Sequence, residues 1–319
     1  MFGIALRTIG WTFIKRPLRR YDPPKRNQDT PIERRLSTST VFLDALDLLG
    51  NQRGIGWSWS KNPFPRDSTP PPSIALLLIK TLFKLTLFDA ARYIVLCVRP
   101  GVDNPGGDTI FDPSLTLVPR AALAALCCAC TGVCGYTTID SLYHIATIVG
   151  RIVYRQPAFM WPRLFHRPWL STSIDEFWSF RWHQLPRRDF VVFGARPGGA
   201  LFGRPGAVMG AFAVSAILHH VGLWGVGEGA DFVTAGGFFL LMGVGAVMEG
   251  AFTRVTGLRV GGWVGWLWTT VWMLLCGTFM VDGWARHGAF GLQWFPDGFR
   301  PGRVIVDAII ALFKQLTIG

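Results

Sequence analysis

Three stretches of the chain contain no Asp, Glu, Lys or Arg: AVMGAFAVSAILHHVGLWGVG at residues 207–227, FVTAGGFFLLMGVGAVM at residues 232–248, and VGGWVGWLWTTVWMLLCGTFMV at residues 260–281. An α-helix needs roughly 20 apolar residues to cross the hydrocarbon core of a bilayer, and each stretch approaches or exceeds that length. A fourth apolar block precedes them at residues 121–139. The sequence therefore predicts an integral membrane protein that crosses the bilayer several times.

The composition of the whole chain agrees with this interpretation. Hydrophobic residues make up 50% of the 319 residues and charged residues only 16%, whereas a soluble domain carries about 25% charged residues. We expect an all-α fold, a polytopic membrane helix bundle with about five or six transmembrane helices and additional cytoplasmic amphipathic helices. The expected spans are residues 73–98, 118–150, 207–226, 232–252 and 260–281, and a weaker segment at residues 304–318 that returns or lies flat on the surface.

The first expected span is less regular than the others, because four charged residues interrupt it: Lys80, Lys84, Asp89 and Arg92. A charge left bare in the middle of the bilayer costs at least about 2.5–3.5 kcal/mol. We therefore expect these side chains to face a cavity or to extend toward the membrane surface.

The formal net charge of +12 is explained by its distribution along the chain. Basic residues concentrate at residues 15–35 and in the long connection at residues 151–204, and the opposing connections are acidic: Asp103, Asp108 and Asp112 in one, Glu228 and Asp231 in the other. Basic connections remain on the cytoplasmic side of membranes. The charge therefore indicates a membrane topology with the N-terminus inside, and no nucleic-acid partner. We expect residues 1–72 to form a basic cytoplasmic or interfacial region with a Pro-rich linker, and residues 73–319 to form the membrane domain.

The six cysteines do not predict a metal site. Four of them lie close together in one apolar block: Cys127, Cys128, Cys130 and Cys134. Structural zinc sites use pairs of cysteines separated by a loop, which a single membrane helix does not provide. We expect these thiols to pack as small hydrophobic groups.

His219 is the candidate for chemistry within a span, because it lies past the middle of an uncharged block. Ionisable residues at such depth usually face the interior of the bundle and mark a functional path. Ser215 precedes it by one helical turn, so its hydroxyl lies on the same face and can orient the imidazole. His220 is rotated by about 100° and points elsewhere. A histidine that is merely satisfied by a neighbouring helix remains an open alternative at this point.

Other polar residues in or beside the spans support weaker predictions. Asp140 and His144 are one turn apart and are expected to form a structural hydrogen bond, with an acid–base pair as the alternative. Glu249 comes just after an apolar block and is expected near a helix terminus at the interface. Asp282 and His287 follow the last strong span and are expected to face solvent.

A second candidate segment is STSIDEFWSFRWHQLPRR at residues 171–188. Ser173 is a plausible N-cap, and Glu176 completes a capping box of the S-x-x-E form. Aromatic and basic side chains follow, several at helical spacing: Phe177, Trp178, Arg181, Trp182, Arg187 and Arg188. Aromatic rings beside guanidinium groups suit a nucleotide that carries phosphates. The alternative is an interfacial amphipathic helix with an aromatic belt.

FWSFRWHQ at residues 177–184, followed by SAILHH at residues 215–220, resembles the signature of the wax synthase-like branch of the membrane-bound O-acyltransferase superfamily. That signature is F-W-x-x-R-W-[HN] and then S-x-x-x-H in a hydrophobic span. LLGNQRGIGWSWS at residues 48–60 resembles the R-G-I-G-W element of fungal members, including those of the terpenoid O-acetyltransferase type. The resemblance covers roughly residues 40–300.

The resemblance implies an enzyme that transfers an acyl group, with acetyl as one candidate, from acyl-CoA to the hydroxyl of a lipophilic alcohol. The acceptor would be a terpenoid, another secondary metabolite or a fatty alcohol, and the membrane that of the endoplasmic reticulum. His219 would be the base and His183 its helper, with Ser215 in support. Coenzyme A is expected as cosubstrate, with no permanently bound cofactor. Two alternatives stay open: a membrane transporter, and a catalytically inactive scaffold that lacks the additional N-terminal spans of family members.

Overall fold

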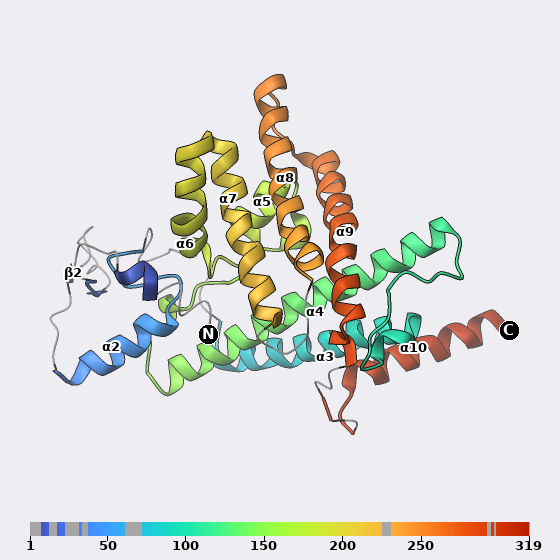
Figure 1. Ribbon diagram of the computed structural model, residues 1–319. Coiled ribbons are helices and arrows are strands. Elements are labelled where there is room, and N and C mark those ends of the chain that lie inside the picture. Colours follow the sequence, from blue (N-terminus) through green and yellow to red (C-terminus); the bar gives the residue numbers. More distant parts are fainter. Residues whose placement is uncertain are drawn as a thin grey trace.

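The computed structural model describes residues 8–12, 18–22, 32–33, 38–60, 72–224, 231–291, 295–296 and 298–318 (Figure 1). Within this part of the chain the fold is all-α, as predicted, apart from one antiparallel pair of two-residue strands, β1 (Tyr21–Asp22) and β2 (Ile32–Glu33). Most of the predicted Pro-rich linker, at residues 61–71, lies outside the described residues.

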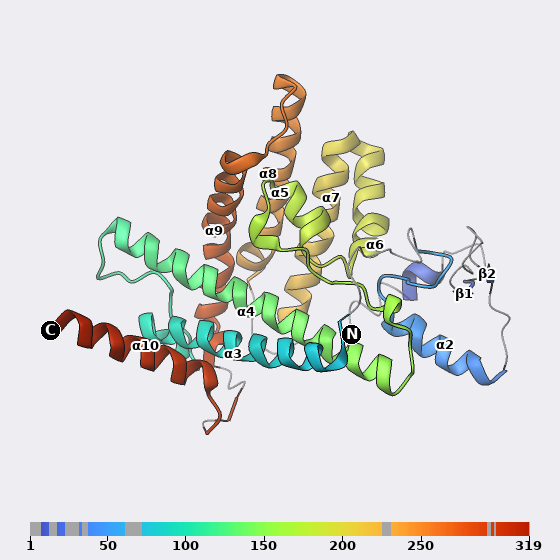
Figure 2. The same ribbon diagram turned by 180° about the vertical axis from the view of Figure 1, so that it is seen from behind.

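The long helices are α2 (Thr38–Gly50), α3 (Ile74–Val98), α4 (Leu117–Ile152), α7 (Arg196–Trp224), α8 (Phe232–Thr256), α9 (Gly262–Arg286) and α10 (Pro301–Ile318). Short helices connect them: η1 (Pro100–Asp103), η2 (Ala158–Met160), η3 (Pro168–Leu170), α5 (Ile174–Glu176), η4 (Phe177–Arg181), α6 (Arg187–Phe190), η5 (Val191–Ala195) and η6 (Ala289–Gly291). Figures 1 and 2 show α7, α8 and α9 side by side, with α3, α4 and α10 crossing beneath them.

Four helical stretches of the described chain are long and apolar enough to cross a membrane: Leu117–Ile152, Arg187–Trp224, Phe232–Thr256 and Gly262–Arg286. The structure therefore has the architecture of a polytopic membrane helix bundle. The predicted number of five or six spans also included the segments that form α3 and α10. Both segments are helical, but neither combines the required length with sufficiently apolar composition.

The stretch Arg187–Trp224 is a helical hairpin and not one straight helix. Phe202 and Gly203 leave the helical conformation, and Gly203 has a φ of +63°, which glycine adopts without a steric penalty. The chain reverses there, so residues 187–201 pack against residues 204–224 (Figure 1). The sequence predicts one long basic connection over residues 151–204, but residues 187–201 are helical, continuing from α6 through η5 into α7.

Glycines hold the two arms of the hairpin together. A Cβ atom on Gly194 would overlap the carbonyl oxygen of Gly210, and a Cβ on Gly198 would overlap that of Gly206. Small residues let helix backbones approach closely in membranes, where van der Waals packing replaces the hydrophobic effect as the driving force. Only the second arm approaches the length that a membrane crossing requires.

Three of the four charges of α3 are buried in the protein, namely Lys84, Asp89 and Arg92, as the cost of a bare charge in lipid requires, whereas Lys80 is exposed. Lys84 forms a buried ion pair with Asp140 of α4 and lies 3.4 Å from His144 Nε2. Asp89 is fully buried; it accepts hydrogen bonds from the Arg300 side chain and from the backbone N–H of Gly302 at the start of α10. These contacts attach α4 and α10 to opposite sides of α3.

The described core has two apolar clusters. One joins α3, α4 and the end of α9, and it includes the free thiols of Cys127, Cys128 and Cys130, so the expected packing of these thiols is confirmed. The other gathers α5, α7, α8 and α9 around Phe239 and Met242. The second cluster contains the motif segment and is the setting of the candidate site.

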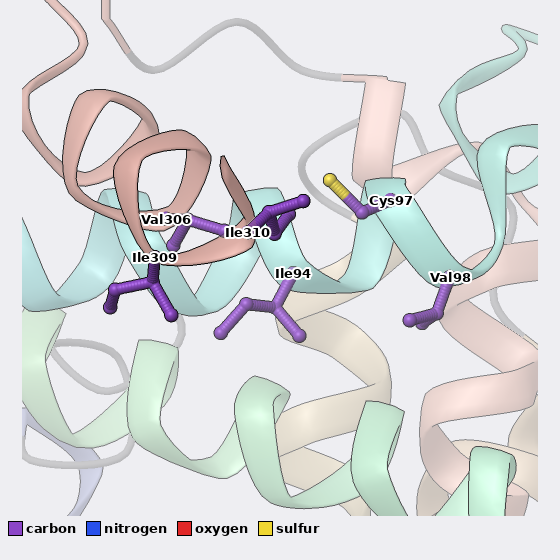
Figure 3. Close-up of a pocket in the computed structure, with 6 residues that line it drawn as sticks. All are labelled: Ile94, Cys97, Val98, Val306, Ile309 and Ile310. Carbon is purple, nitrogen blue, oxygen red and sulfur yellow. The ribbon is translucent and has the colours of Figure 1, made fainter. Parts of the chain in front are cut away.

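An apolar groove lies between α3 and α10, away from these motifs (Figure 3). Six residues line it: Ile94, Cys97, Val98, Val306, Ile309 and Ile310. It contains no group that could take or give a proton in acyl transfer other than the Cys97 thiol. The candidate site therefore lies at His219 of α7 and not in this groove.

Candidate active site

The motif segment begins at the predicted N-cap. The Ser173 side chain accepts a hydrogen bond from the Glu176 backbone N–H at 2.9 Å, and α5 starts at Ile174. The Glu176 carboxylate does not return to Ser173: it accepts from the backbone N–H of Thr172 at 2.8 Å and from the Thr172 hydroxyl. Burial alone would raise the pKa of Glu176, but these bonds and the guanidinium of Arg181 hold that pKa below its usual value.

The spacing of the aromatic residues after α5 predicts an α-helix, but the structure has a wider, π-helical turn there. Residues Phe177–Arg181 form a π-helical turn, which ends where the Trp182 N–H bonds to the Phe177 carbonyl at 2.8 Å. Single π-turns are rare and occur frequently at functional sites. This turn presents the Trp178 ring to α7 and α8, where it contacts three phenylalanine rings: Phe212, Phe238 and Phe239.

His219 lies against this aromatic cluster, with its imidazole stacked on Phe239 at a centroid distance of 4.0 Å. Its Nδ1 is 2.8 Å from the backbone carbonyl oxygen of Ser215 and 3.5 Å from the Ser215 hydroxyl. A carbonyl oxygen only accepts hydrogen bonds, so Nδ1 carries the proton and Nε2 keeps its lone pair. Ser215 shares the helix face of His219 as predicted, although its main chain makes the shorter contact.

His183 comes from the end of the motif segment. Its half-buried ring meets Phe165 edge-on at 5.8 Å and Trp182 at 5.7 Å. Burial and, to a smaller extent, the proximity of His219 lower the pKa of His183 to about 4. The fold thus brings the two predicted catalytic histidines into one electrostatic neighbourhood, and His183 is neutral at pH 7.

Two polar atoms of this neighbourhood are buried without a hydrogen-bond partner among the described residues: Nδ1 of His183 and Nε1 of Trp178. Trp182 lies between their rings, at 6.0 Å from Trp178 and 5.7 Å from His183. Most buried polar groups in proteins are paired, and those that are not are frequently reserved for a ligand or for catalysis.

The three predicted phosphate-binding arginines have different surroundings. The Arg181 guanidinium is held by Glu176 at 2.7 Å and by the carbonyl of His166 at 3.1 Å, so it stabilises the motif segment itself. The Arg188 guanidinium lies over the Trp59 ring at 4.6 Å. Arg187 is exposed. Arg187 and Arg188 therefore remain the arginines that can meet a charged ligand.

The R-G-I-G-W element packs on the segment that leads to the site. Gly54 and Gly56 have φ values of +67° and +78°, which only glycine adopts easily. The Arg53 side chain donates to the Pro162 carbonyl at 3.1 Å, and Trp59 meets Arg188 as described above. All three motif elements found in the sequence thus belong to one connected region.

Two acidic residues have partners that the sequence does not predict. Glu249 lies within α8, is 6% exposed and accepts hydrogen bonds from the first turn of α5. Asp282 does not face solvent: its side chain is 14% exposed and accepts hydrogen bonds from the Thr109 hydroxyl and the Ile110 N–H. In the sequence, Glu249 stands out as a lone acidic residue beside an apolar block. The sequence does not reveal its partners, because the N–H groups of Ile174 and Asp175 are about 75 positions away.

A sequence profile of the membrane bound O-acyl transferase family matches residues 161–241, which include the motif segment and His219. The chain is also similar to fungal transferases. It is 25% identical to O-Mevalon transferase yanI of Aspergillus niger, over 58% of this chain and 46% of the relative. It is 24% identical to O-Mevalon transferase macI of Penicillium terrestre, over 75% and 61%. It is 27% identical to Acetyltransferase ple2 of Rhodocybe pseudopiperita, over 71% and 62%.

The matched region spans between 46% and 62% of the length of these relatives. Within it, the family profile covers the same residues that bring His183, Trp178 and His219 together. The apolar helices and the fungal relatives agree with that match. Residues 161–241 are thus similar to the membrane bound O-acyl transferase family, and the chain is similar to fungal transferases.

Proposed function

We propose that this chain transfers an acyl group from acyl-CoA to the hydroxyl of a lipophilic alcohol in the endoplasmic reticulum membrane. The observation that carries the proposal is the state of His219: its Nδ1 proton is bound to the Ser215 carbonyl, which leaves Nε2 as a proton acceptor. A hydroxyl is a poor nucleophile until a base removes its proton, whereas a thioester carbonyl is already electrophilic. A neutral imidazole at membrane depth meets that need.

In the proposed reaction, His219 Nε2 takes the hydroxyl proton as the alcohol oxygen attacks the thioester carbon. A C–O bond forms and the carbonyl oxygen becomes an oxyanion. His183 and Trp178 have buried nitrogen atoms without partners, which suits them to stabilise that oxyanion or the leaving thiolate. The intermediate collapses with cleavage of the C–S bond, and the thiolate takes the proton back from His219. The reaction therefore neither consumes nor releases a proton overall.

The donor and acceptor have opposite solubilities, and the proposed site accommodates both. Arg187 and Arg188 would meet the phosphates of coenzyme A, with Trp182 and Trp178 along its path. The alcohol would enter from the bilayer. Relatives named acetyltransferase and O-Mevalon transferase support a secondary metabolite, such as a terpenoid, as acceptor and acetyl as one candidate acyl group.

The test is acyl transfer in microsomes from a heterologous host. Acetyl-, octanoyl- and palmitoyl-CoA would each be offered with a panel of terpenoid, sterol and fatty alcohols. His219→Ala is expected to reduce ester formation by about 10²- to 10⁴-fold, the usual contribution of a positioned base. His220→Ala is the matched control, since its ring faces Phe232, and it should stay within a few-fold of wild type. Undiminished transfer by His219→Ala at equal protein level would refute the assignment.

A further inference from the structure

Glu249 is a buried acid that belongs to none of the sequence motifs. It lies on α8, and its carboxylate has three donors: the backbone N–H of Ile174 at 2.7 Å, that of Asp175 at 3.0 Å, and the indole N–H of Trp268 at 2.9 Å. Two of these donors open α5, and the third comes from α9. One side chain thus ties three elements together.

The contact completes the capping of α5. The first N–H groups of a helix have no partner within the helix. Here Glu249 accepts from Ile174 and Asp175, and the Ser173 hydroxyl accepts from Glu176. The bonds are specific in direction, so they set the position of α5 on α8.

The segment that α5 begins leads directly to the candidate site. Trp178 follows within one turn, and His183 follows after the π-turn η4. The same helix α8 that carries Glu249 also carries Phe239, on which His219 stacks. Ten residues of α-helix separate Phe239 from Glu249, a rigid distance of about 15 Å. Helix α8 therefore holds one half of the site through Phe239 and the other half through Glu249.

We propose that Glu249 is the positioning residue that holds the motif segment, with Trp178 and His183, opposite His219. It does not touch the reacting atoms. This inference rests on the proposed acyl transfer and deepens it: the catalytic geometry depends on an acid outside the family motifs. A misplacement of about 1 Å in a catalytic group can cost 10²-fold in rate. Loss of the contacts between Glu249 and α5, which we call the anchor, should therefore lower kcat.

Kinetics test the anchor with two substitutions. Glu249→Leu removes both acceptors, and Glu249→Gln keeps one acceptor oxygen for the α5 N–H groups. We expect kcat to fall by about 10- to 100-fold for Glu249→Leu and by less for Glu249→Gln, with KM for the donor changed by less than about threefold. Thr253→Val is the control, because Thr253 donates only to the main-chain oxygen of Glu249, and it should keep wild-type kcat.

A double variant separates positioning from general damage. In a His183→Ala background, Glu249→Gln should lower kcat by less than about threefold, because the contribution of the motif segment is already lost. A merely destabilising substitution would act equally in both backgrounds. Equal losses in the two backgrounds, or wild-type kcat in Glu249→Leu, would overturn the inference.

Hydrogen exchange gives a readout that does not require activity. In the purified full chain, Glu249→Leu should raise exchange in the peptide covering residues 172–184 and leave the peptides of α7 unchanged. Glu249→Gln should show a smaller rise and serves if the Leu variant does not fold. Unchanged exchange in residues 172–184 would overturn the anchor. Raised exchange in a chain that transfers no acyl group with any tested substrate would overturn the proposed function and still support Glu249 as the anchor of the segment.

Discussion

At the residue scale, the environment of His183 changes its pKa, although the sequence alone already identifies this side chain as a candidate. The motif predicts a polar residue beside the base. The fold encloses it between Phe165 and Trp182, leaves its Nδ1 without a partner and lowers its pKa to about 4. In the proposed reaction, a neutral His183 at pH 7 would stabilise developing negative charge by hydrogen bonding, and His219 would take the proton.

The lowered pKa of His183 predicts how stability depends on pH. Between its ordinary pKa of 6.5 and its folded pKa of about 4, the unfolded chain binds a proton that the folded chain does not. Stability from this group is therefore complete above pH 6.5 and falls as the pH drops toward 4, by up to about 3 kcal/mol. Thermal midpoints of the detergent-solubilised protein between pH 7.5 and 5.0 should fall less steeply in His183→Asn than in wild type. Parallel curves would contradict the prediction.

At the element scale, the hairpin of residues 187–224 determines where His219 stands. Its second arm carries Ser215 and His219, and its first arm presses on it through glycine contacts. Those contacts are made by backbone atoms, which cannot rotate away from an added methyl group as a flexible side chain can. The position of the base thus depends on residues that have no side chain at all.

The hairpin predicts unequal effects for two glycine substitutions on one arm. Gly210→Ala places a Cβ against the Gly194 carbonyl, whereas Gly222→Ala meets no atom within 4 Å. Overpacking typically costs about 1–3 kcal/mol, so Gly210→Ala should lower the thermal midpoint by several degrees, by about 2–8 °C for a chain of this size. Gly222→Ala should leave the midpoint near that of wild type. Similar midpoints for both variants would refute the close approach.

At the scale of the whole molecule, the charged turns divide between two ends. The hairpin turn, next to Arg204, and the turn between α8 and α9, with Arg259, lie at the same end of the upright helices in Figure 1. Asp231 begins α8 at the opposite end. Because basic connections stay in the cytoplasm, the end with Arg204 and Arg259 is expected to be cytoplasmic.

This orientation can be measured by cysteine labelling in sealed microsomes. In a Cys97→Ser background, Phe202→Cys and Leu258→Cys should react with a membrane-impermeant maleimide added outside. Val233→Cys should react only after permeabilisation. All three positions are exposed in the structure, and the native cysteines other than Cys97 are buried or half-buried. The reverse labelling pattern would overturn the assigned orientation.

The sequence by itself determined the helical membrane character of this protein, because uninterrupted apolar stretches in a bilayer must satisfy their own backbone hydrogen bonds. It also determined features that depend on local spacing. Ser173 caps α5, and Ser215 lies on the helix face of His219. Each of these contacts joins residues three or four positions apart, so periodicity along the chain is sufficient to predict them.

The tertiary structure alone decided features that depend on residues far apart in the chain. Glu249 meets α5 from a distance of about 75 positions, and Asp282 meets Ile110 across the molecule. Residues 187–201 are helical because Gly194 and Gly198 let them pack on the following arm, although their charges suggest a loop. Local patterns carry no information about such contacts, because their energy comes from the partner and not from the segment.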